Sequence, residues 1–308
     1  MKTATQTLSR LRFRTPLSSD YATIARYMGL MDSRTCDYTF GGIVLWAPHF
    51  GYRIAEADNT LYISGGREDD LTVRAYALPV GDADLTRSVR LLKQQTPGAD
   101  VWFSAVPEDR LHLFAAIAGA DVSELGPEWS DYLYDIRAMA SLSGGAMKKK
   151  RNHVNRFLAD NPDAQLTALD GRNAAECMEL LHASGHDSTP TGISEFAAVE
   201  TLLGRWSDFE PWLCGSVLTA GGRVRGFTVG EVKDDTLHVH VEKCDHSVAG
   251  ANEALASMFA SEMLARNQRL LYVNRQDDAG DPGLRASKES WHPLRLLPKF
   301  NVMVGRRA

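Results

Sequence analysis

The chain alternates between two spacings of apolar residues, one typical of helices and the other typical of strands. In the N-terminal part, residues 17–30 and 85–95 have apolar side chains three or four positions apart, which predicts two helices. Short apolar runs bounded by turn-forming residues predict strands at residues 41–47, 52–57, 61–64, 74–78 and 101–105. Pro107 is expected to open a third helix, which would end at Gly119.

The second half of the chain shows the same alternation. Helices are expected at residues 146–159, 173–184, 194–206, 251–266 and 284–290. Strands are expected at residues 165–169, 212–219, 224–232, 236–241, 270–274 and 301–305. This mixture predicts an α/β fold with mixed sheets, and the recurring order of elements suggests an internal duplication without a letter-by-letter repeat. We therefore expect two domains, residues 1–135 and 136–308.

Composition narrows the class of protein. Hydrophobic residues make up 44% of the 308 residues and charged residues 24%, which excludes a disordered chain. No apolar run reaches the roughly 18–20 residues that span a bilayer, and the first residues lack the apolar segment of a secretory signal. The four cysteines form no C-x-x-C pair, so we expect neither a metal site nor a disulfide framework. Together these features predict a cytoplasmic protein without a transmembrane segment.

One basic segment contrasts with the acidic average of the chain. The 34 Lys and Arg against 39 Asp and Glu give a net charge of −5, yet residues 148–156 hold five basic residues and no acidic one. On a helix this segment would present two polar faces, one with Lys148, Arg151 and Asn155 and the other with Lys149, His153 and Arg156. Such a surface suits a phosphate-bearing partner, and the alternative is a solvated helix without a partner.

Residues 237–255 combine a strand, a loop of small residues and the start of a helix. Strict alternation would place His238, His240 and Glu242 on one face of the strand. A loop before a helix N-terminus suits a phosphate, and residues 246–251 match the coenzyme A loop of GNAT-type acetyltransferases only in degenerate form. The two histidines suggest a metal only weakly, because a half-exposed sheet face explains them more simply.

Charged residues gather directly after the apolar run at residues 270–274. Ligands of open α/β sheets bind at the carboxyl ends of strands, so this position favours a site. Asp277 or Asp278 would orient or deprotonate an amine. The candidates for holding a negative group are Arg275, Arg285 and Lys288. The alternative is that these charges only pair with one another.

Four separated motifs together resemble one family, the branch of the phosphatidylglycerol lysyltransferase C-terminal domain family that lacks membrane segments. The motifs are KRNHVNRF (150–157), Glu242-Lys243, NRQDDAG (274–280), and GLRASK (283–288) followed by Pro293. The resemblance covers residues 130–303 and implies two GNAT-like domains in tandem. Gln276 and Trp291 depart from the family pattern, which has Glu and Tyr at these positions.

The resemblance also implies a reaction. Lysyl- and alanyl-phosphatidylglycerol synthases and Fem-type peptidoglycan aminoacyltransferases move an aminoacyl group from tRNA to an amine or hydroxyl. For this chain we expect an acyltransferase with aminoacyl-tRNA as donor substrate, no other cofactor, and Glu242, Arg275 and Asp278 as catalytic residues. The expected substrate-binding residues are Lys243, Asn274, Arg285, Lys288, Lys149, Lys150, Arg151 and Arg156, the last four at the tRNA acceptor end. The acceptor would be a small molecule, a peptide or a lipid headgroup.

Two other functions remain open at this point. The donor of the acyl group would be acyl-CoA if residues 246–251 bind a pyrophosphate, although their degenerate motif argues against it. A non-catalytic binder or two-domain scaffold is the third hypothesis, in which the charged motifs only hold the protein together. That hypothesis requires Arg275, Asp278 and Glu242 to be buried and paired with no cavity beside them.

Overall fold

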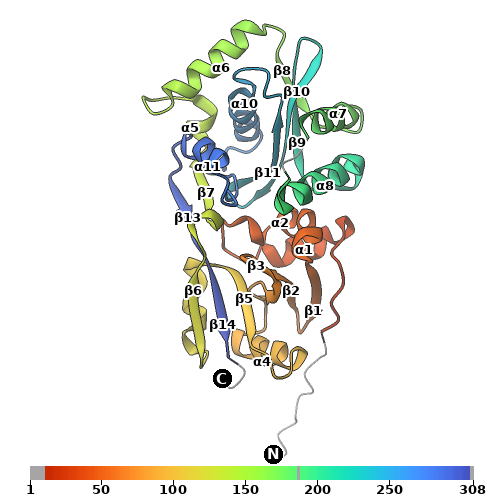
Figure 1. Ribbon diagram of the computed structural model, residues 1–308, viewed down its shortest axis with the longest axis vertical. Coiled ribbons are helices and arrows are strands. Elements are labelled where there is room, and N and C mark those ends of the chain that lie inside the picture. Colours follow the sequence, from red (N-terminus) through yellow and green to blue (C-terminus); the bar gives the residue numbers. More distant parts are fainter. Residues whose placement is uncertain (1–10, 186–187, 306–308) are drawn as a thin grey trace, which may run out of the picture. The chain divides into compact units, whose positions relative to one another are not determined.

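The computed structural model describes residues 11–185 and 188–305 (Figure 1). These residues form two compact units, the first with residues 11–33, 50–127 and 298–305, and the second with residues 34–49, 128–185 and 188–297. Each unit is built on a seven-stranded sheet, which confirms the prediction of a mixed α/β fold. No helix in the described ranges is long and apolar enough to cross a membrane.

The sheet of the first unit is an antiparallel meander extended by a parallel strand. Its strands are β1 (Arg53–Ala57), β2 (Thr60–Arg67), β3 (Asp70–Tyr76), β4 (Val80–Gly81), β5 (Val101–Pro107), β6 (Ala120–Glu124) and β14 (Lys299–Val304). The order is β1-β2-β3-β5-β14-β6 with β4 on β2, and β3 runs parallel to β5. The helices are α1 (Tyr21–Met28), α4 (Leu85–Gln95) and 3-10 segments at Ser18–Asp20 and Glu108–Ala116. Asp84 starts α4 by accepting a hydrogen bond from the N–H of Arg87.

The second unit contains the other sheet and most of the helices. Its strands are β7 (Asp131–Asp135), β8 (Gln165–Ala168), β9 (Cys214–Ala220), β10 (Arg223–Lys233), β11 (Thr236–Cys244), β12 (Tyr272–Asn274) and β13 (Arg295–Leu297). Its helices are α2 (Phe40–Leu45), α3 (Ala47–Phe50), α5 (Ile136–Ser141), α6 (Lys148–Asp160), α7 (Ala174–Ser184), α8 (Pro190–Gly204), α9 (Trp206–Phe209), α10 (Ala251–Arg266) and α11 (Pro282–Glu289), with 3-10 segments at Cys36–Tyr38 and Pro127–Trp129. The strand order is β13-β7-β12-β11-β10-β9-β8.

Helices cover both faces of this second sheet. In Figure 1, α7 and α8 lie on one side, and α5, α6 and α10 lie on the other. The main core forms on the α10 side, where Leu255 and Phe259 pack with Tyr134, Phe157 and Trp291. Full burial of a Leu or Phe side chain contributes roughly 1.5–3 kcal/mol. These contacts therefore hold α6 and α10 on the sheet.

The two sheets share one topology. In each, an antiparallel meander (β1-β2-β3 or β9-β10-β11) leads through a helix (α4 or α10) to a parallel strand (β5 or β12). Each parallel strand has a non-glycine residue with positive φ near its carboxyl end, Ala105 at 53° within β5 and Gln276 at 58° just after β12. Each lies two residues beyond the last parallel pair, Tyr76 with Phe103 or His238 with Asn274. The repeated strain at one position supports an internal duplication.

The last strands of the two halves are exchanged. Strand β7 ends the first half of the sequence but lies between β12 and β13 in the sheet of the second unit. Strand β14 ends the second half but lies between β5 and β6 in the sheet of the first unit. The compact units therefore differ from the two contiguous domains expected at residues 1–135 and 136–308.

Some predicted elements are wrong. Residues 41–47, expected as a strand, form α2 and the start of α3, because their backbone N–H groups are satisfied by Thr39 and Glu231 rather than by a neighbouring strand. The helix expected after Pro107 is a 3-10 segment that ends at Ala116. The pattern also gave no strand for β6, β7 or β13, which are short segments of three to five residues.

Candidate functional site

Two neighbouring strands diverge in the second unit. Strands β11 and β12 pair in parallel from Thr236 with Tyr272 to His238 with Asn274. Beyond this point β12 ends, whereas β11 continues to Cys244. The carboxyl ends of parallel strands are where α/β folds bind ligands, so the divergence is the candidate site.

A β-bulge at His240 sets which side chains reach each face of β11. Val229 of β10 pairs with Val241 and Gly230 pairs with Val239, so His240 has no partner on β10. The bulge shifts the alternation by one residue beyond this point. The prediction that His238, His240 and Glu242 share a face is therefore wrong.

His240 is buried against the segment of residues 34–49. Its Nδ1 lies 3.0 Å from Nε2 of Gln276, and its Nε2 lies 3.3 Å from a carboxylate oxygen of Glu231. Glu231 also accepts hydrogen bonds from the N–H groups of Phe40 at 3.0 Å and Gly41 at 2.7 Å, which are the first residues of α2. Burial raises the pKa of Glu231, but its hydrogen bonds and the charge of His240 outweigh burial, and the pKa lies below its ordinary value.

A small pocket lies beside His240. Its walls come from α2 (Leu45), α8 (Ala198, Val199, Leu202) and β11 (His240, Val241), and its interior has room for about one water molecule. Glu195 of α8 also borders the pocket and forms an ion pair of 2.8 Å with Lys243. The bulge explains why two consecutive residues of β11 border the same pocket and why Lys243 reaches the same helix.

Glu242 instead meets Arg275, the residue after β12. The two form an ion pair of 2.6 Å and are 14% and 8% exposed. The guanidinium lies over the rings of Trp291 at 5.6 Å and Tyr134 at 5.9 Å, both members of the core on the α10 side. Its Nη1 is buried and has no hydrogen-bond partner among the described residues. The ion pair therefore joins the diverging strands and leaves one N–H donor group unused.

Asp278 is fully buried and engaged by three donors. Arg285 donates two hydrogen bonds of 2.9 Å, Tyr132 donates one of 2.7 Å, and the N–H of Gly280 donates one of 2.9 Å. Burial raises the pKa of Asp278, but these donors outweigh it, and the pKa lies below its ordinary value. The carboxylate therefore anchors the 275–285 loop and has no access to a substrate proton.

Lys288 and Asn274, both expected to bind substrate, are buried within the same unit. The ammonium of Lys288 donates hydrogen bonds to the carbonyls of Arg275, at 2.6 Å, and Asp277. Burial lowers the pKa of Lys288 to about 8. Asn274 donates from its side-chain amide to a carboxylate oxygen of Asp131 at 2.7 Å and to the carbonyl of Arg34. These two residues hold the loop and the 34–49 segment in place.

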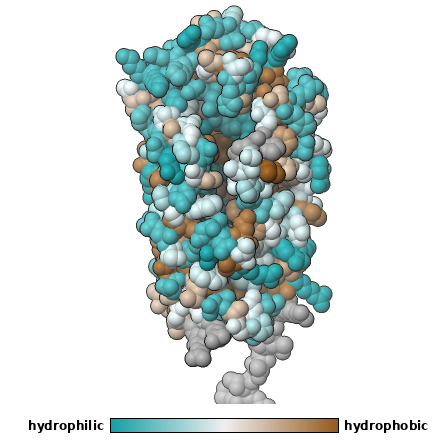
Figure 2. Space-filling model, viewed as in Figure 1, coloured by the Kyte–Doolittle hydropathy of each residue, from teal (hydrophilic) through white to brown (hydrophobic). Residues whose placement is uncertain are grey.

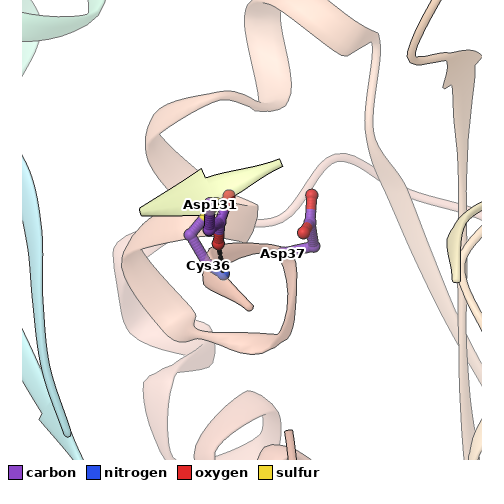
Figure 3. A group of neighbouring side chains, drawn as sticks. All are labelled: Cys36, Asp37 and Asp131. Atoms are coloured by element: carbon purple, nitrogen blue, oxygen red, sulfur yellow. Dashed lines mark hydrogen bonds between the residues drawn. The ribbon is translucent and has the colours of Figure 1, made fainter. Parts of the chain in front are cut away.

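Cys36, Asp37 and Asp131 are the one group among the described residues with metal-ligand spacing. Their ligand atoms lie within 4.8 Å of one another, and in Figure 3 Asp131 lies against Cys36 while Asp37 stands apart. Both oxygens of Asp131 already accept hydrogen bonds from Cys36, one from its N–H at 2.6 Å and one from its thiol at 3.5 Å. We interpret the group as an anchor of the 34–49 segment.

The basic run forms α6 as expected, but its charges have different surroundings. Lys150 is buried, pairs with Glu253 of α10 at 3.2 Å and lies 4.8 Å from the centre of the Trp291 ring. Arg151 donates hydrogen bonds to the carbonyls of Leu142 and Gly144. Lys149 and Arg156 are exposed, and hydrophilic residues cover most of the end of the view where α6 lies (Figure 2). The expected phosphate contact by Lys150 does not fit its burial.

The N-terminus of α10 is covered by α6. A Cβ at Gly250, the residue before α10, would lie 2.6 Å from the carbonyl oxygen of His153 and 3.1 Å from Phe157. Glu253 places a carboxylate in the first turn. A pyrophosphate at this N-terminus would meet the carbonyl and the carboxylate, both of which repel it.

Residues 28–303 match the family model described as phosphatidylglycerol lysyltransferase, C-terminal, and the chain belongs to this family. A conserved protein of unknown function from Bacteroides thetaiotaomicron is 27% identical, with a TM-score of 0.85 over 96% of this chain and 99% of that chain. The alignment with an uncharacterized protein of Mycoplasmoides gallisepticum is 23% identical and spans 60% of this chain and 59% of that protein's length.

Two further solved structures share the fold. One is the C-terminal domain of a protein assigned as lysylphosphatidylglycerol synthetase from Agrobacterium fabrum, 15% identical with a TM-score of 0.61 over 94% of this chain and 93% of that chain. The other is FemX, 8% identical with a TM-score of 0.60 over 96% of this chain and 97% of that chain. Family and fold together support a GNAT-like acyltransferase.

The sequence singled out most of the residues at the divergence but missed their partners. Glu242, Arg275 and Lys243 lie where β11 and β12 separate, and Asn274 ends β12. Glu231 and the 34–49 segment were missed, because only the fold brings α2 onto β10 and β11. Thr39 is the N-cap of α2, and a threonine directly before an apolar segment is a sequence signal for the start of a helix.

Proposed function

We propose that the protein transfers an aminoacyl group from aminoacyl-tRNA to an amine or hydroxyl acceptor at the divergence of β11 and β12. The observation that supports this donor best is the covered N-terminus of α10, where GNAT-type acetyltransferases bind the coenzyme A pyrophosphate. The same α6 that covers it carries the exposed Lys149 and Arg156, which suit the phosphates of an acceptor end.

The chemistry of such a transfer is ester aminolysis or transesterification. The acceptor nitrogen or oxygen forms a bond to the ester carbon, the bond from that carbon to the ribose oxygen breaks, and the acceptor's proton ends on the ribose hydroxyl. In this proposal Arg275 orients the carboxylate of Glu242 through their 2.6 Å ion pair, since its Nη1 is buried and out of reach of a substrate carbonyl. Glu242, held by Arg275, accepts the proton and returns it to the leaving oxygen.

The other proposed residues act around this centre. Lys243 of β11, which pairs with Glu195, and Arg285 of α11, which fixes Asp278, are the proposed cations for a negative group of the substrate. Asp278, Asn274 and Lys288 act as positioning residues, because each is buried and bonded to the backbone or to another side chain. Arg151 orients the start of α6.

Filter binding with aminoacyl-tRNA over a salt series tests the donor. We expect binding that weakens as salt rises, and a smaller salt slope, by about 0.7–0.9 per lost phosphate contact, for Lys149→Ala and Arg156→Ala. Arg90→Ala, an exposed residue of α4, is the matched control and should keep the full slope. Absent or salt-independent binding would overturn the tRNA donor.

The non-catalytic hypothesis is favoured by one observation, the pairing of Arg275 with Glu242 and of Asp278 with Arg285. The pocket beside His240 does not argue against it, because none of Glu242, Arg275 and Asp278 borders that pocket. Arg275→Lys separates the two functions. We expect this variant to retain its melting temperature within a few degrees and to lose the aminoacyl transfer of the wild type. Transfer by the variant at the wild-type rate would show that Arg275 is not catalytic, and absence of transfer by the wild type would favour a scaffold.

A further inference from the structure

Side-chain contacts connect β11 to the residues after β12 beyond the point where backbone pairing between the two strands ends. Arg275 joins Glu242 by an ion pair of 2.6 Å, and Gln276 joins His240 with 3.0 Å between the amide nitrogen and Nδ1. Consecutive residues after β12 thus reach two positions of β11. These contacts continue the connection at the divergence, where the candidate site lies.

The two contacts lie on opposite faces of β11. Arg275 lies over the rings of Trp291 and Tyr134, which belong to the core on the α10 side. His240 instead packs against α2, where a Cβ at Gly41 would lie 2.4 Å from its Nε2. Contacts on both faces restrain the residues after β12 against tilting toward either side of the sheet.

The backbone of residues 275 and 276 belongs to the β7 side of the divergence. Tyr132 of β7 donates its N–H to the carbonyl of Gln276 at 3.0 Å and accepts a hydrogen bond from the N–H of Arg275 at 3.1 Å. The side chains of Arg275 and Gln276 therefore link this backbone to β11. Loss of the Gln276 contact should loosen the position of Arg275 relative to Glu242.

Gln276 makes its contact from a strained backbone conformation. Its φ is 58°, in the left-handed region that costs a non-glycine residue about 1–3 kcal/mol. Its N–H donates to Oδ1 of Asn274 at 2.7 Å. Glycine would adopt this conformation without strain, so the backbone alone gives no reason for a glutamine here. The side chain gives one, through His240.

The far end of the contact is fixed by α2. Nε2 of His240 lies 3.3 Å from a carboxylate oxygen of Glu231, which accepts hydrogen bonds from the N–H groups of Phe40 and Gly41. A chain of polar contacts therefore runs from the start of α2 through Glu231 and His240 to Gln276.

An amide at position 276 can keep this contact in either protonation state of His240. A neutral ring with its proton on Nε2 accepts from the amide N–H at Nδ1, and an imidazolium donates from Nδ1 to the amide oxygen. A carboxylate at position 276 can only accept, so it would need a proton on Nδ1. In the described part of the chain, the titratable groups that face His240 are Glu231 of β10, His238 of β11 and Glu195 of α8, whereas the sequence of α2, FGGIVL, contributes none.

We propose that Gln276 is a positioning residue for the acyl transfer. Through His240 it holds the backbone of residues 275 and 276 against β11, so that Arg275 keeps the carboxylate of Glu242 in place for the acceptor's proton. The inference rests on the proposed function and adds to it a residue that acts from the opposite face of the sheet.

Carbon-detected NMR of the arginine guanidinium groups in the full chain tests the contact without a substrate. We expect separate Nη signals for Arg275, identified by their absence in Arg275→Lys, because the ion pair slows rotation of the guanidinium. Gln276→Gly should keep the fold, since glycine accepts a positive φ, and should merge these signals. Gln268→Gly, at an exposed glutamine before β12, is the matched control and should leave them separate. Separate signals in Gln276→Gly would overturn the inference.

Gln276→Glu distinguishes the side-chain contact from a general loss of packing. At pH 6 two carboxylates favour an imidazolium at His240, whose Nδ1–H restores the contact, so the Nη signals should stay separate. At pH 9 the neutral ring has one N–H, which Glu231 retains because α2 fixes its carboxylate, and the variant should resemble Gln276→Gly. The wild type, in which Lys288 also titrates over this range, should show separate signals at both pH values. Merged signals in Gln276→Glu at pH 6 would contradict the proposed contact.

Transfer from charged bulk tRNA to ethanolamine, a probe with an amine and a hydroxyl, gives the catalytic arm. Gln276→Gly should lower kcat about tenfold to a hundredfold through misplacement of Glu242, and KM for tRNA should not change, because α6 is untouched. Gln268→Gly should keep the wild-type kcat. If the wild type and Gln276→Gly transfer equally, the proposed function stands and this inference fails. If the wild type transfers nothing, the proposed function fails, and the NMR signals still decide whether Gln276 positions Arg275.

Discussion

Lys150 of α6 lies 3.2 Å from Glu253 of α10, and the two side chains are only 8% and 16% exposed. Burial lowers the pKa of Lys150. For Glu253, burial raises the pKa, but the charge of Lys150 and the hydrogen bonds outweigh it, and the pKa is lowered. The basic run thus contains one lysine that holds two helices together and neighbours that face solvent.

Replacing Lys150 should therefore destabilise the protein far more than replacing Lys149. Lys150→Ala leaves the carboxylate of Glu253 without this partner, and we expect a loss of about 2–3 kcal/mol in the free energy of unfolding, below the roughly 3–5 kcal/mol of fully buried pairs. Lys149→Ala should change it by less than about 0.5 kcal/mol. Urea denaturation at neutral pH measures both, and equal losses would refute the assignment.

Gly41 should not tolerate a side chain, because α2 packs tightly on His240. An added Cβ would lie 2.4 Å from Nε2 of His240. Alanine normally favours a helix over glycine, yet we expect Gly41→Ala to cost about 1–3 kcal/mol through overpacking. Gly145→Ala is the control, since a Cβ there meets nothing within 4 Å. In a double-mutant cycle, Gly41→Ala combined with His240→Ala should cost at least about 1 kcal/mol less than the sum of the single changes, and additive losses would show that the two do not clash.

His238 should make the protein sensitive to mild acid. It is fully buried, its ring nitrogens have no hydrogen-bond partner among the described residues, and burial lowers its pKa to about 3. The charged and titratable groups that act on it are His240, Glu231, Asp131 and Lys233. Because the unfolded chain binds a proton near pH 6.5 that the folded chain does not, stability falls as the pH drops below about 6.5, with a slope from this residue approaching about 1.4 kcal/mol per pH unit.

His238→Leu should remove this slope and leave no unpartnered polar atom. We expect its free energy of unfolding to equal or exceed that of the wild type by about 1 kcal/mol at pH 7.5, with a larger difference at pH 5. The exposed His246 offers the control, and His246→Leu should keep the wild-type slope. A wild-type slope in His238→Leu would assign the acid sensitivity to another group.

The exchanged strands predict that neither half of the sequence folds alone. A chain cut between Gly144 and Gly145, in an exposed loop, gives one fragment without β14 and another without β7. We expect each fragment to be unfolded or aggregated by itself and the co-expressed pair to purify together with native circular dichroism. Two fragments that fold independently as monomers would show that the exchanged strands are dispensable.

The sequence allowed prediction where local pattern decides structure. The bounds of α10, residues 251–266, follow from a long apolar spacing between a glycine and an asparagine. The residues after β12 were recognised because their charges follow an apolar run. In both cases the information lies within a few residues of the element.

Prediction failed where distant residues decide. The apolar run at 41–47 is equally compatible with a buried strand or a helix. Glu231 selects the helix because it accepts hydrogen bonds from the N–H groups of Phe40 and Gly41, which precede it by 191 and 190 residues in the sequence. The bulge at His240 depends on pairing with β10, which no alternation pattern records. Buried partners such as Glu253 for Lys150 are likewise set only by helix packing.

The exchange of β7 and β14 has a consequence for synthesis on the ribosome. Strands β5 and β6 do not pair with each other and are joined through β14, which follows all elements of the second unit in the sequence. Until residues 299–304 emerge, β5 is open on the side away from β3 and β6 has no strand partner, so both can pair with other chains. Its completion therefore waits until the second unit has been synthesised, and conditions that slow synthesis of residues 128–298 should expose the nascent protein to chaperones.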